Sequence, residues 1–148
     1  MPLVKATLKQ GLLAAYANVG DTAAACANAI GDAVGAYAAS VVPPSLGVAA
    51  ATTALKAALA GAFSAGPGQG LALAETAFTA FGAAVGAGMA PGFTATPPTG
   101  PVGFASQTDA LDSADAACDM LAGLIHDWMT SGSAVANAPT PPPPVNWS

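Results

Sequence analysis

The fold is decided by the stretch TAAACANAIGDAVGAYAASVVPPSLGVAAATTALKAALAGAFSA, residues 22–65. Apolar residues recur in it at intervals of three and four, the spacing that places them on one face of an α-helix. The run Val41-Val42-Pro43-Pro44-Ser45 interrupts this pattern, because proline disfavours helical geometry in the residue before it and serine can cap a new helix. We therefore expect one helix over residues 22–40 and a second over residues 46–65.

The same spacing predicts three more helices outside this stretch. One covers residues 2–18, and another runs from about residue 71 to 90 after a glycine-rich turn at residues 66–70. A last helix opens at Thr108 and ends at Ser131, before a glycine. The expected fold class is all-α: a compact bundle of about five helices with an extended proline-rich loop and a C-terminal arm.

Two proline-rich segments are incompatible with helix. Residues 91–107 are expected to form the extended loop, and a long loop without regular structure in a compact domain is often a binding loop. Residues 133–148 are expected to form the proline-rich C-terminal arm. The predicted organisation is thus a helical domain over residues 1–132, which includes the loop, followed by the arm.

These two segments are the expected partner-binding regions. Proline is already restricted to extended conformations, so such a segment loses little entropy when it is ordered on a partner. Trp147 offers a large apolar ring that suits a pocket of a neighbouring subunit. The predicted partner-binding residues are Phe93, Pro97, Pro98, Phe104, Pro141, Pro142, Pro143, Pro144 and Trp147.

Charge is scarce throughout the chain. Three lysines and eight acidic residues are the only charged residues among 148, or 7%, whereas about a quarter of the residues of an ordinary soluble domain are charged. Residues 76–108 and 130–148 carry no charge at all. A surface with so few charges does little to repel neighbouring molecules, and we therefore expect it to be covered.

The composition also argues against several classes of partner. Phosphate binding needs clustered Lys and Arg, and this chain has three scattered lysines and no arginine, so we expect neither nucleic-acid binding nor a polybasic membrane contact. The uncharged residues 76–108 are rich in Gly and Pro and poor in the bulky residues that favour insertion, so we expect no transmembrane helix there.

The sequence offers little chemistry. His126 is the only histidine; its neighbour Asp127 points about 100° away around a helix, and Cys118 lies eight residues away, too far to form a nucleophile–base pair. The acids Asp109, Asp112, Asp115 and Asp119 match no calcium loop, and they fit the positive end of the last helix. We therefore expect no catalytic residues, metal, cofactor or small-molecule substrate.

The two cysteines, Cys26 and Cys118, both lie in Ala-rich helical stretches. They are either joined in a disulfide between an early helix and the last one, or reduced and buried as small hydrophobic residues. The second interpretation is preferred, and the sequence leaves both open.

The chain also resembles small Ala-rich virion proteins of tailed bacteriophages. The matching features are the opening MPLVKATLKQGL, the exit YAASVVPPS at residues 37–45, the loop TPPTGPVGF at 96–104, and DWMTSG at 127–132 with the terminal VNWS. This resemblance implies a structural role and a place in the virion, assembled in the host cytoplasm from other virion proteins and copies of this chain. An alternative is a secreted Ala- and Pro-rich interaction protein of a bacterial surface.

Overall fold

The structure is a computed structural model that describes residues 2–18, 20–107 and 112–148. Within these ranges the chain forms five α-helices, a short 3-10 helix and a small sheet, which confirms the predicted fold class of a compact, mostly helical bundle. The α-helices are α1 (Lys5–Asn18), α2 (Ala23–Ala38), α3 (Val48–Ser64), α4 (Pro67–Ala87) and α5 (Ala114–Thr130).

The first three helices lie close to their predicted bounds, whereas the last two begin elsewhere. The chain turns at Gly66, which has a φ of 81°, and α4 starts at Pro67, so the turn predicted over residues 66–70 is wrong in length. Proline favours the first position of a helix because its missing N–H is not needed there. Thr108 and Asp109, which were expected to open the last helix, lie outside the described residues; α5 is capped by Ser113, whose hydroxyl accepts from Ala116 N.

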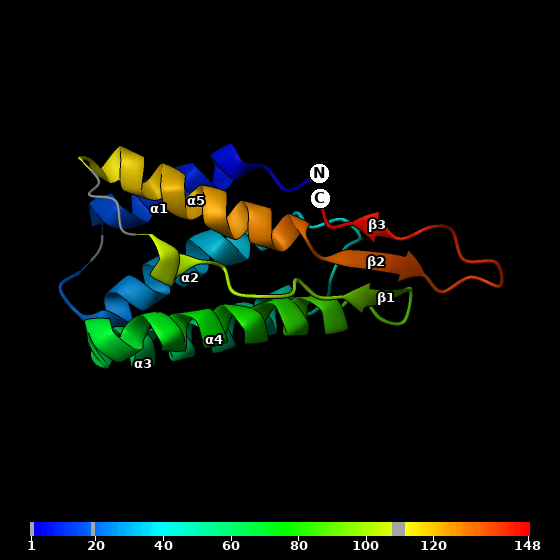
Figure 1. Cartoon of the computed structure of the whole chain (residues 1–148), viewed down its shortest axis with the longest axis horizontal. Helices are drawn as coiled ribbons and strands as arrows, with labels where there is room; N and C mark the ends of the chain where they lie inside the picture. Colours follow the sequence, from blue (N-terminus) through cyan, green and yellow to red (C-terminus); the bar gives the residue numbers. More distant parts are fainter. Residues whose placement is uncertain (1, 19, 108–111) are drawn as a thin grey trace.

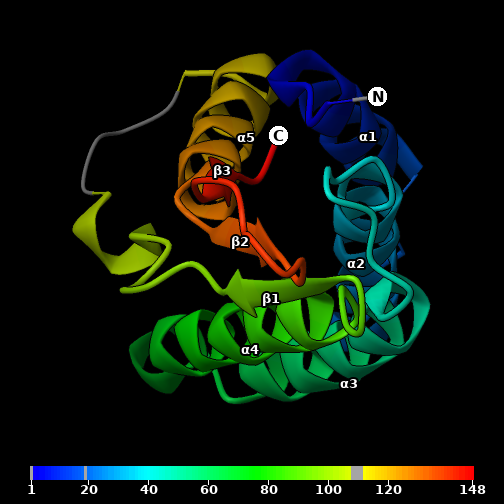
Figure 2. The ribbon, with the colours of Figure 1, turned by 90° about the vertical axis from the view of Figure 1, so that its right-hand side faces the viewer.

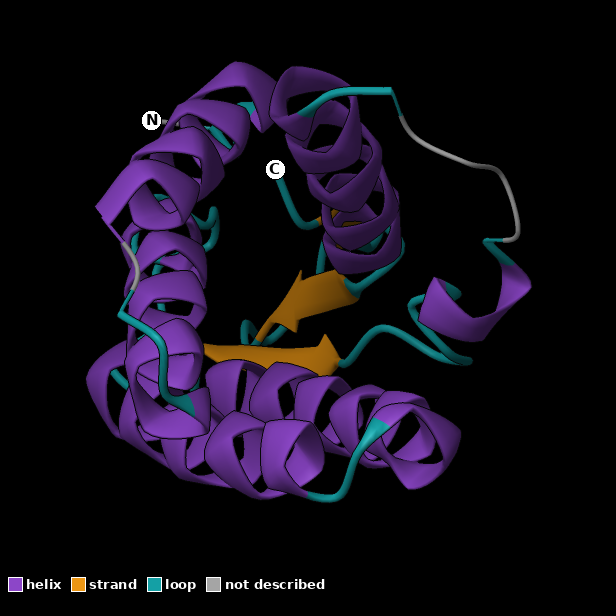
Figure 3. Ribbon diagram, turned by 90° about the vertical axis from the view of Figure 1, so that its left-hand side faces the viewer, coloured by secondary structure: helices purple, strands orange, loops and turns teal. Residues whose placement is uncertain are grey.

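The helices are packed in a ring, with α2 between α1 and α3, α3 against α4, and α5 beside α1 (Figure 2). Gly31 and Gly35 let α2 and α3 approach closely, because a Cβ at either position would collide with Lys56 or Thr52 of α3. In the opposite view, from the end where α4 begins, the helices surround the two main strands (Figure 3).

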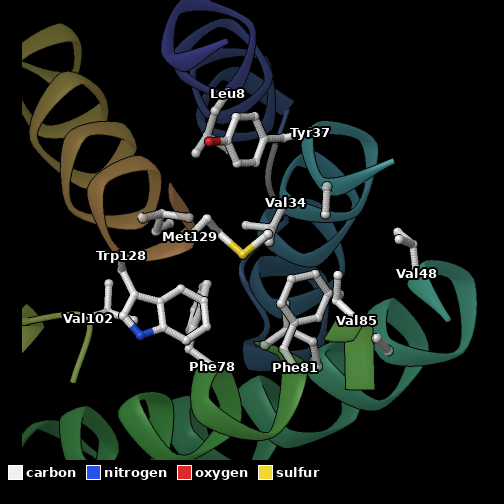
Figure 4. Packing of buried hydrophobic residues seen from close by; sticks show 14 of the residues in the cluster. Leu8, Val34, Tyr37, Val48, Phe78, Phe81, Val85, Val102, Trp128 and Met129 are labelled. Carbon is white, nitrogen blue, oxygen red and sulfur yellow. The ribbon is translucent and has the colours of Figure 1, made fainter. Parts of the chain in front are cut away.

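Bulky side chains fill the centre of this Ala-rich ring (Figure 4). Phe78 and Trp128 meet edge to face with ring centroids 6.0 Å apart, and Phe104 packs against Phe78 at 5.1 Å. Phe81 and Met129 are also buried in this cluster. Such aromatic pairs contribute about 0.5–1.5 kcal/mol each beyond the area they bury, so a few large residues compensate for the small contribution of each alanine.

Three short strands form a sheet at one end of the ring (Figure 1). They are β1 (Phe93–Thr96), β2 (Ser133–Ala136) and β3 (Val145–Asn146), in the order β1-β2-β3 with both pairs antiparallel. Phe93 pairs with Ala136, and Ala134 pairs with Val145. The sequence predicted that the loop and the arm are extended, but not that they pair with each other through backbone hydrogen bonds.

Candidate subunit interface

All three lysines are used in ion pairs between helices. Lys5 Nζ lies 3.1 Å from Asp119 and Lys9 Nζ lies 2.9 Å from Asp115, which ties α1 to α5. A hydrogen bond from Lys5 lowers the pKa of Asp119, and a hydrogen bond to Asp115 raises the pKa of Lys9. Lys56 of α3 lies 2.6 Å from Asp32 of α2. The cations therefore hold the ring together and offer little to an anionic partner.

The single charge of α4 is also used within the chain. The carboxylate of Glu75 accepts hydrogen bonds from the backbone N–H groups of Val102, Gly103 and Phe104, at 2.6, 2.9 and 2.7 Å. Hydrogen bonds to an ionised acceptor are shorter and stronger than neutral ones. Glu75 thus fixes the second half of the loop 91–107 against α4, and it is the anchor of this loop that the sequence analysis missed.

The exposed residues of α3 and α4 consequently include no charged side chain, and half-buried Lys56 of α3 is paired with Asp32 of α2. We call the exposed residues of these two helices the α3–α4 surface. They are Ala49, Ala50, Thr53, Ala54, Ala57, Ala58, Gly61, Phe63, Ser64, Gly68, Gln69, Leu71, Ala72, Leu73, Thr76, Thr79, Ala80, Ala83 and Ala87. Most are small, and each threonine on α4 donates its hydroxyl to a carbonyl four residues earlier, which leaves few groups that need water. Leu46, 90% exposed, lies just before α3.

The predicted partner-binding residues of the loop pack against this chain's own helices. Phe93 and Phe104 are half-buried against the core, and Pro98 is buried. Pro97 and Pro98 lie over Gly86 and Gly82 of α4, where a Cβ would come within 3.2 and 3.3 Å of their rings. The two glycines therefore give space to the loop, and Gly82 also gives space to Trp128 of α5, whose ring would come within 2.8 Å of a Cβ there. The loop is mostly part of the fold, and little of these four side chains is left for a partner.

Trp147 was predicted to fill a pocket of a neighbouring subunit, whereas the structure places it inside its own chain. Its side chain is 1% exposed, and its Nε1–H donates to the Ser133 carbonyl at 3.1 Å. The ring lies directly over Gly132, where a Cβ would come within 2.7 Å of Cδ2. The indole fits there because Gly132 has no side chain. The spacing of residues along the sequence does not show that these two residues meet.

The prolines of the C-terminal arm are placed differently from the other predicted contacts. Pro141, Pro142, Pro143 and Pro144 are all exposed in the connection between β2 and β3. This connection projects beyond the sheet at the end of the molecule (Figure 1). Of the nine predicted contact residues, these four are the ones that the described surface offers freely.

His126 is paired with a tyrosine that the sequence analysis did not connect to it. The Tyr37 hydroxyl lies 2.6 Å from His126 Nδ1. Burial, with the nearby charge of Asp127, raises the pKa of Tyr37 well above its usual range. Tyr37 therefore stays protonated, and the hydrogen bond between its hydroxyl and Nδ1 joins α2 to α5. In the part of the chain that the structure describes, no Ser, Thr or Cys side chain is hydrogen-bonded to the phenol or the imidazole; the Ser40 and Thr130 hydroxyls donate to the backbone carbonyls of Tyr37 and His126.

The cysteines lie on two walls of one apolar cavity. Cys26 is half-buried, Cys118 is buried, and both are free thiols. Burial raises the pKa of Cys118, which disfavours the reactive thiolate. The cavity, of about 260 Å³, lies among α1, α2 and α5 and adjoins a second one of about 360 Å³ that shares Leu12, Ile30 and Leu121 with it. Both linings are almost entirely apolar, apart from the two thiols and Gln107.

The described residues also bear on two other kinds of site, a metal site and a membrane span. Over residues 2–18, 20–107 and 112–148, no three His, Cys, Asp or Glu side chains gather closely enough to hold a metal ion. One helix, over residues 68–87 of α4, is long and apolar enough to cross a membrane by length and composition. Of that window, 44% is buried within the chain, and one such helix is weak evidence for a membrane span.

No family model, curated protein or solved structure matches this chain. Function must therefore be argued from the molecule's own surface. That surface combines the α3–α4 surface, whose exposed residues include no charged side chain, with an exposed proline segment.

Proposed function

We propose that this chain is a non-enzymatic structural subunit of a phage virion, either in the tail or baseplate or associated with the capsid. The observation that carries the proposal is the α3–α4 surface, whose exposed residues include no charged side chain. A protein that works alone normally covers its surface with interspersed charges of both signs. In a repeated subunit the same surface is covered by neighbours, so the charges are not needed.

The chemistry of this surface also favours a protein partner. Ala, Gly and Thr allow two helices to approach closely, and Leu73 adds an exposed apolar side chain, 43% accessible, among them. A stable interface buries about 1,200–2,000 Å² in total, about half of it on each partner, and α3 and α4, of 17 and 21 residues, pack side by side along this surface. The partners that we propose are other virion proteins and copies of this chain.

The exposed prolines offer a second contact. Pro141 to Pro144 form an extended segment without regular secondary structure, and they project from the end of the molecule that carries the sheet. Because a proline segment is already restricted, its docking on an adjacent subunit costs little ordering entropy. We propose that this segment lies across a neighbour in the particle.

The proposal is tested by finding where the chain resides. Particles purified on a density gradient from cells that produce the chain are analysed by mass spectrometry, and the free-protein fractions are analysed beside them. We expect the chain in the particle fractions at constant ratio to the other particle proteins. Recovery only from the culture medium as free protein would contradict a virion role and favour the surface interaction protein instead.

A further inference from the structure

The C-terminal residues form a plug that fills a socket elsewhere in the chain. We call Trp147 and Ser148 the plug, and the socket is formed by Val42, Gly86 and the residues 132–133. Trp147 N donates to the Gly132 carbonyl at 2.8 Å, and its Nε1 donates to Ser133 O at 3.1 Å. Ser148 and Val42 exchange two backbone hydrogen bonds, at 2.8 and 3.2 Å. The plug thus closes the core at the end of the ring.

The plug is tied to the rest of the molecule through a long and exposed connection. Residues 137–144, Asn-Ala-Pro-Thr-Pro-Pro-Pro-Pro, are all exposed and join β2 to β3, whereas most hairpin loops have two to five residues. The two strands pair over only two residues each, so the sheet itself holds β3 weakly. Four consecutive prolines favour an extended path, which opposes the reversal that a hairpin needs.

From this arrangement we propose that the plug is exchanged between copies of the chain, so that Trp147 of one subunit fills the socket of the next. The inference rests on the proposed function, because exchange needs copies held close together in an assembly. It gives the C-terminal arm a defined partner: a second copy of this chain, bound through the socket.

The contacts of the plug are the same whichever chain supplies it. Each hydrogen bond of Trp147 and Ser148 is made to the socket. In the linker, Asn137 is held by hydrogen bonds with Pro91, Gly92 and Thr94, whereas residues 139–144 make no hydrogen bond among those of the described residues. Whether the plug fills its own socket or the socket of a neighbouring copy therefore depends on the reach of the linker and on how many copies lie close by. An extended proline segment advances about 3.1 Å per residue, so residues 138–144, beyond the anchored Asn137, can span roughly 22 Å.

The exchange is tested by a disulfide between plug and socket. Val42 and Ser148 are both exposed, and mutually hydrogen-bonded residues on antiparallel segments have Cα atoms about 5.5 Å apart, within the range of a disulfide. In a background with Cys26→Ala and Cys118→Ala, one chain carries Val42→Cys and another carries Ser148→Cys. The two chains are refolded together, concentrated, oxidised and separated on a non-reducing gel.

We expect the mixture to shift to a covalent heterodimer. A single chain that carries both substitutions should form a ladder of covalent oligomers. The control mixture pairs Val42→Cys with Thr140→Cys, which lies on the exposed linker, and it should remain largely monomeric. If the mixture stays monomeric while the doubly substituted chain closes a disulfide within itself, the exchange is refuted.

Sedimentation of the unmodified chain separates this result from the proposed function. If the chain forms oligomers in sedimentation but the mixed cysteine variants give no covalent heterodimer, only the exchange is contradicted, because each plug then fills its own socket. A chain that stays monomeric at every concentration contradicts self-assembly and the exchange together.

Discussion

Replacement of Trp147 by alanine should be among the most destabilising changes in this chain, although the residue is next to last. A tryptophan side chain buries about 150–250 Å², and Trp147 is 1% exposed. At about 25 cal/mol per Å², its burial contributes roughly 4–6 kcal/mol. Trp147→Ala also removes the hydrogen bond from Nε1 to Ser133 O. We expect a loss of about 4 kcal/mol, within the range for large core residues changed to alanine.

Urea and thermal unfolding, followed by circular dichroism of the helices, measure this loss. For a chain of this length each kcal/mol lowers Tm by about 2–4 °C, so the variant should melt roughly 8–16 °C below the parent protein. The effect is the same whether the plug comes from the same chain or from a neighbour, because the socket is emptied in both cases. Pro142→Ala, on the exposed linker of the same arm, is the matched control and should change stability by less than about 0.5 kcal/mol.

A Trp147→Ala variant as stable as the Pro142→Ala control would refute the reasoning. It would mean that the indole contributes nothing to the core and that the space over Gly132 is filled some other way. The placement of β3, and with it the socket, would then be wrong.

Three other substitutions test the contacts that hold the ring and the loop. Glu75→Ala should speed hydrogen exchange at the amides of residues 102–104 and lower the free energy of unfolding by about 2 kcal/mol. Glu75→Gln keeps one carbonyl acceptor and should protect these amides in part. Unchanged exchange in both variants would contradict the anchoring role. Tyr37→Phe should cost about 1–2 kcal/mol in chemical unfolding because His126 Nδ1 loses its hydrogen-bond partner, and equal stability would show that water replaces the hydroxyl. Asp119→Asn should lower Tm at neutral pH, because Lys5 lowers the pKa of Asp119 in the folded state. The difference in Tm from the parent protein should be fully present above the unfolded pKa near 3.8, and it should vanish as pH falls through the folded-state pKa. A difference that persists at the lowest pH would assign the effect to packing rather than to charge.

The helices could be predicted from sequence because their signals are local. Apolar spacing and the Val41-to-Ser45 break place α2 and α3 within two residues of their observed bounds. The start of α4 was misplaced because a glycine-rich run contains several candidate turns, and only the backbone shows that Gly66 is the one with positive φ. Strand pairing between β1 and β2 joins residues about 40 positions apart, and four-residue strands leave no periodicity to detect.

The candidate interface was predicted only in part, for a related reason. Charge scarcity is visible in the composition, and it led to the prediction of a covered surface at residues 76–108 and 130–148. Where that surface lies depends on which charges are used internally, as with Glu75 bound to the loop backbone, and this is a property of the folded chain. An aromatic residue in a proline segment can pack against a partner or against the core of its own chain. The sequence analysis assigned Trp147 to a partner, because the space over Gly132 exists only in the folded chain.

Self-association of the α3–α4 surface is tested most directly by placing one charge on it. Ala80 is exposed on α4 within this surface, and Ala6 is exposed on α1 beside the ion pairs of the opposite side. Sedimentation velocity over a range of concentrations compares Ala80→Lys with Ala6→Lys and the parent chain. We predict that the parent and Ala6→Lys form concentration-dependent oligomers and that Ala80→Lys stays monomeric. Equal association of all three proteins would contradict the assignment of this surface as the subunit interface.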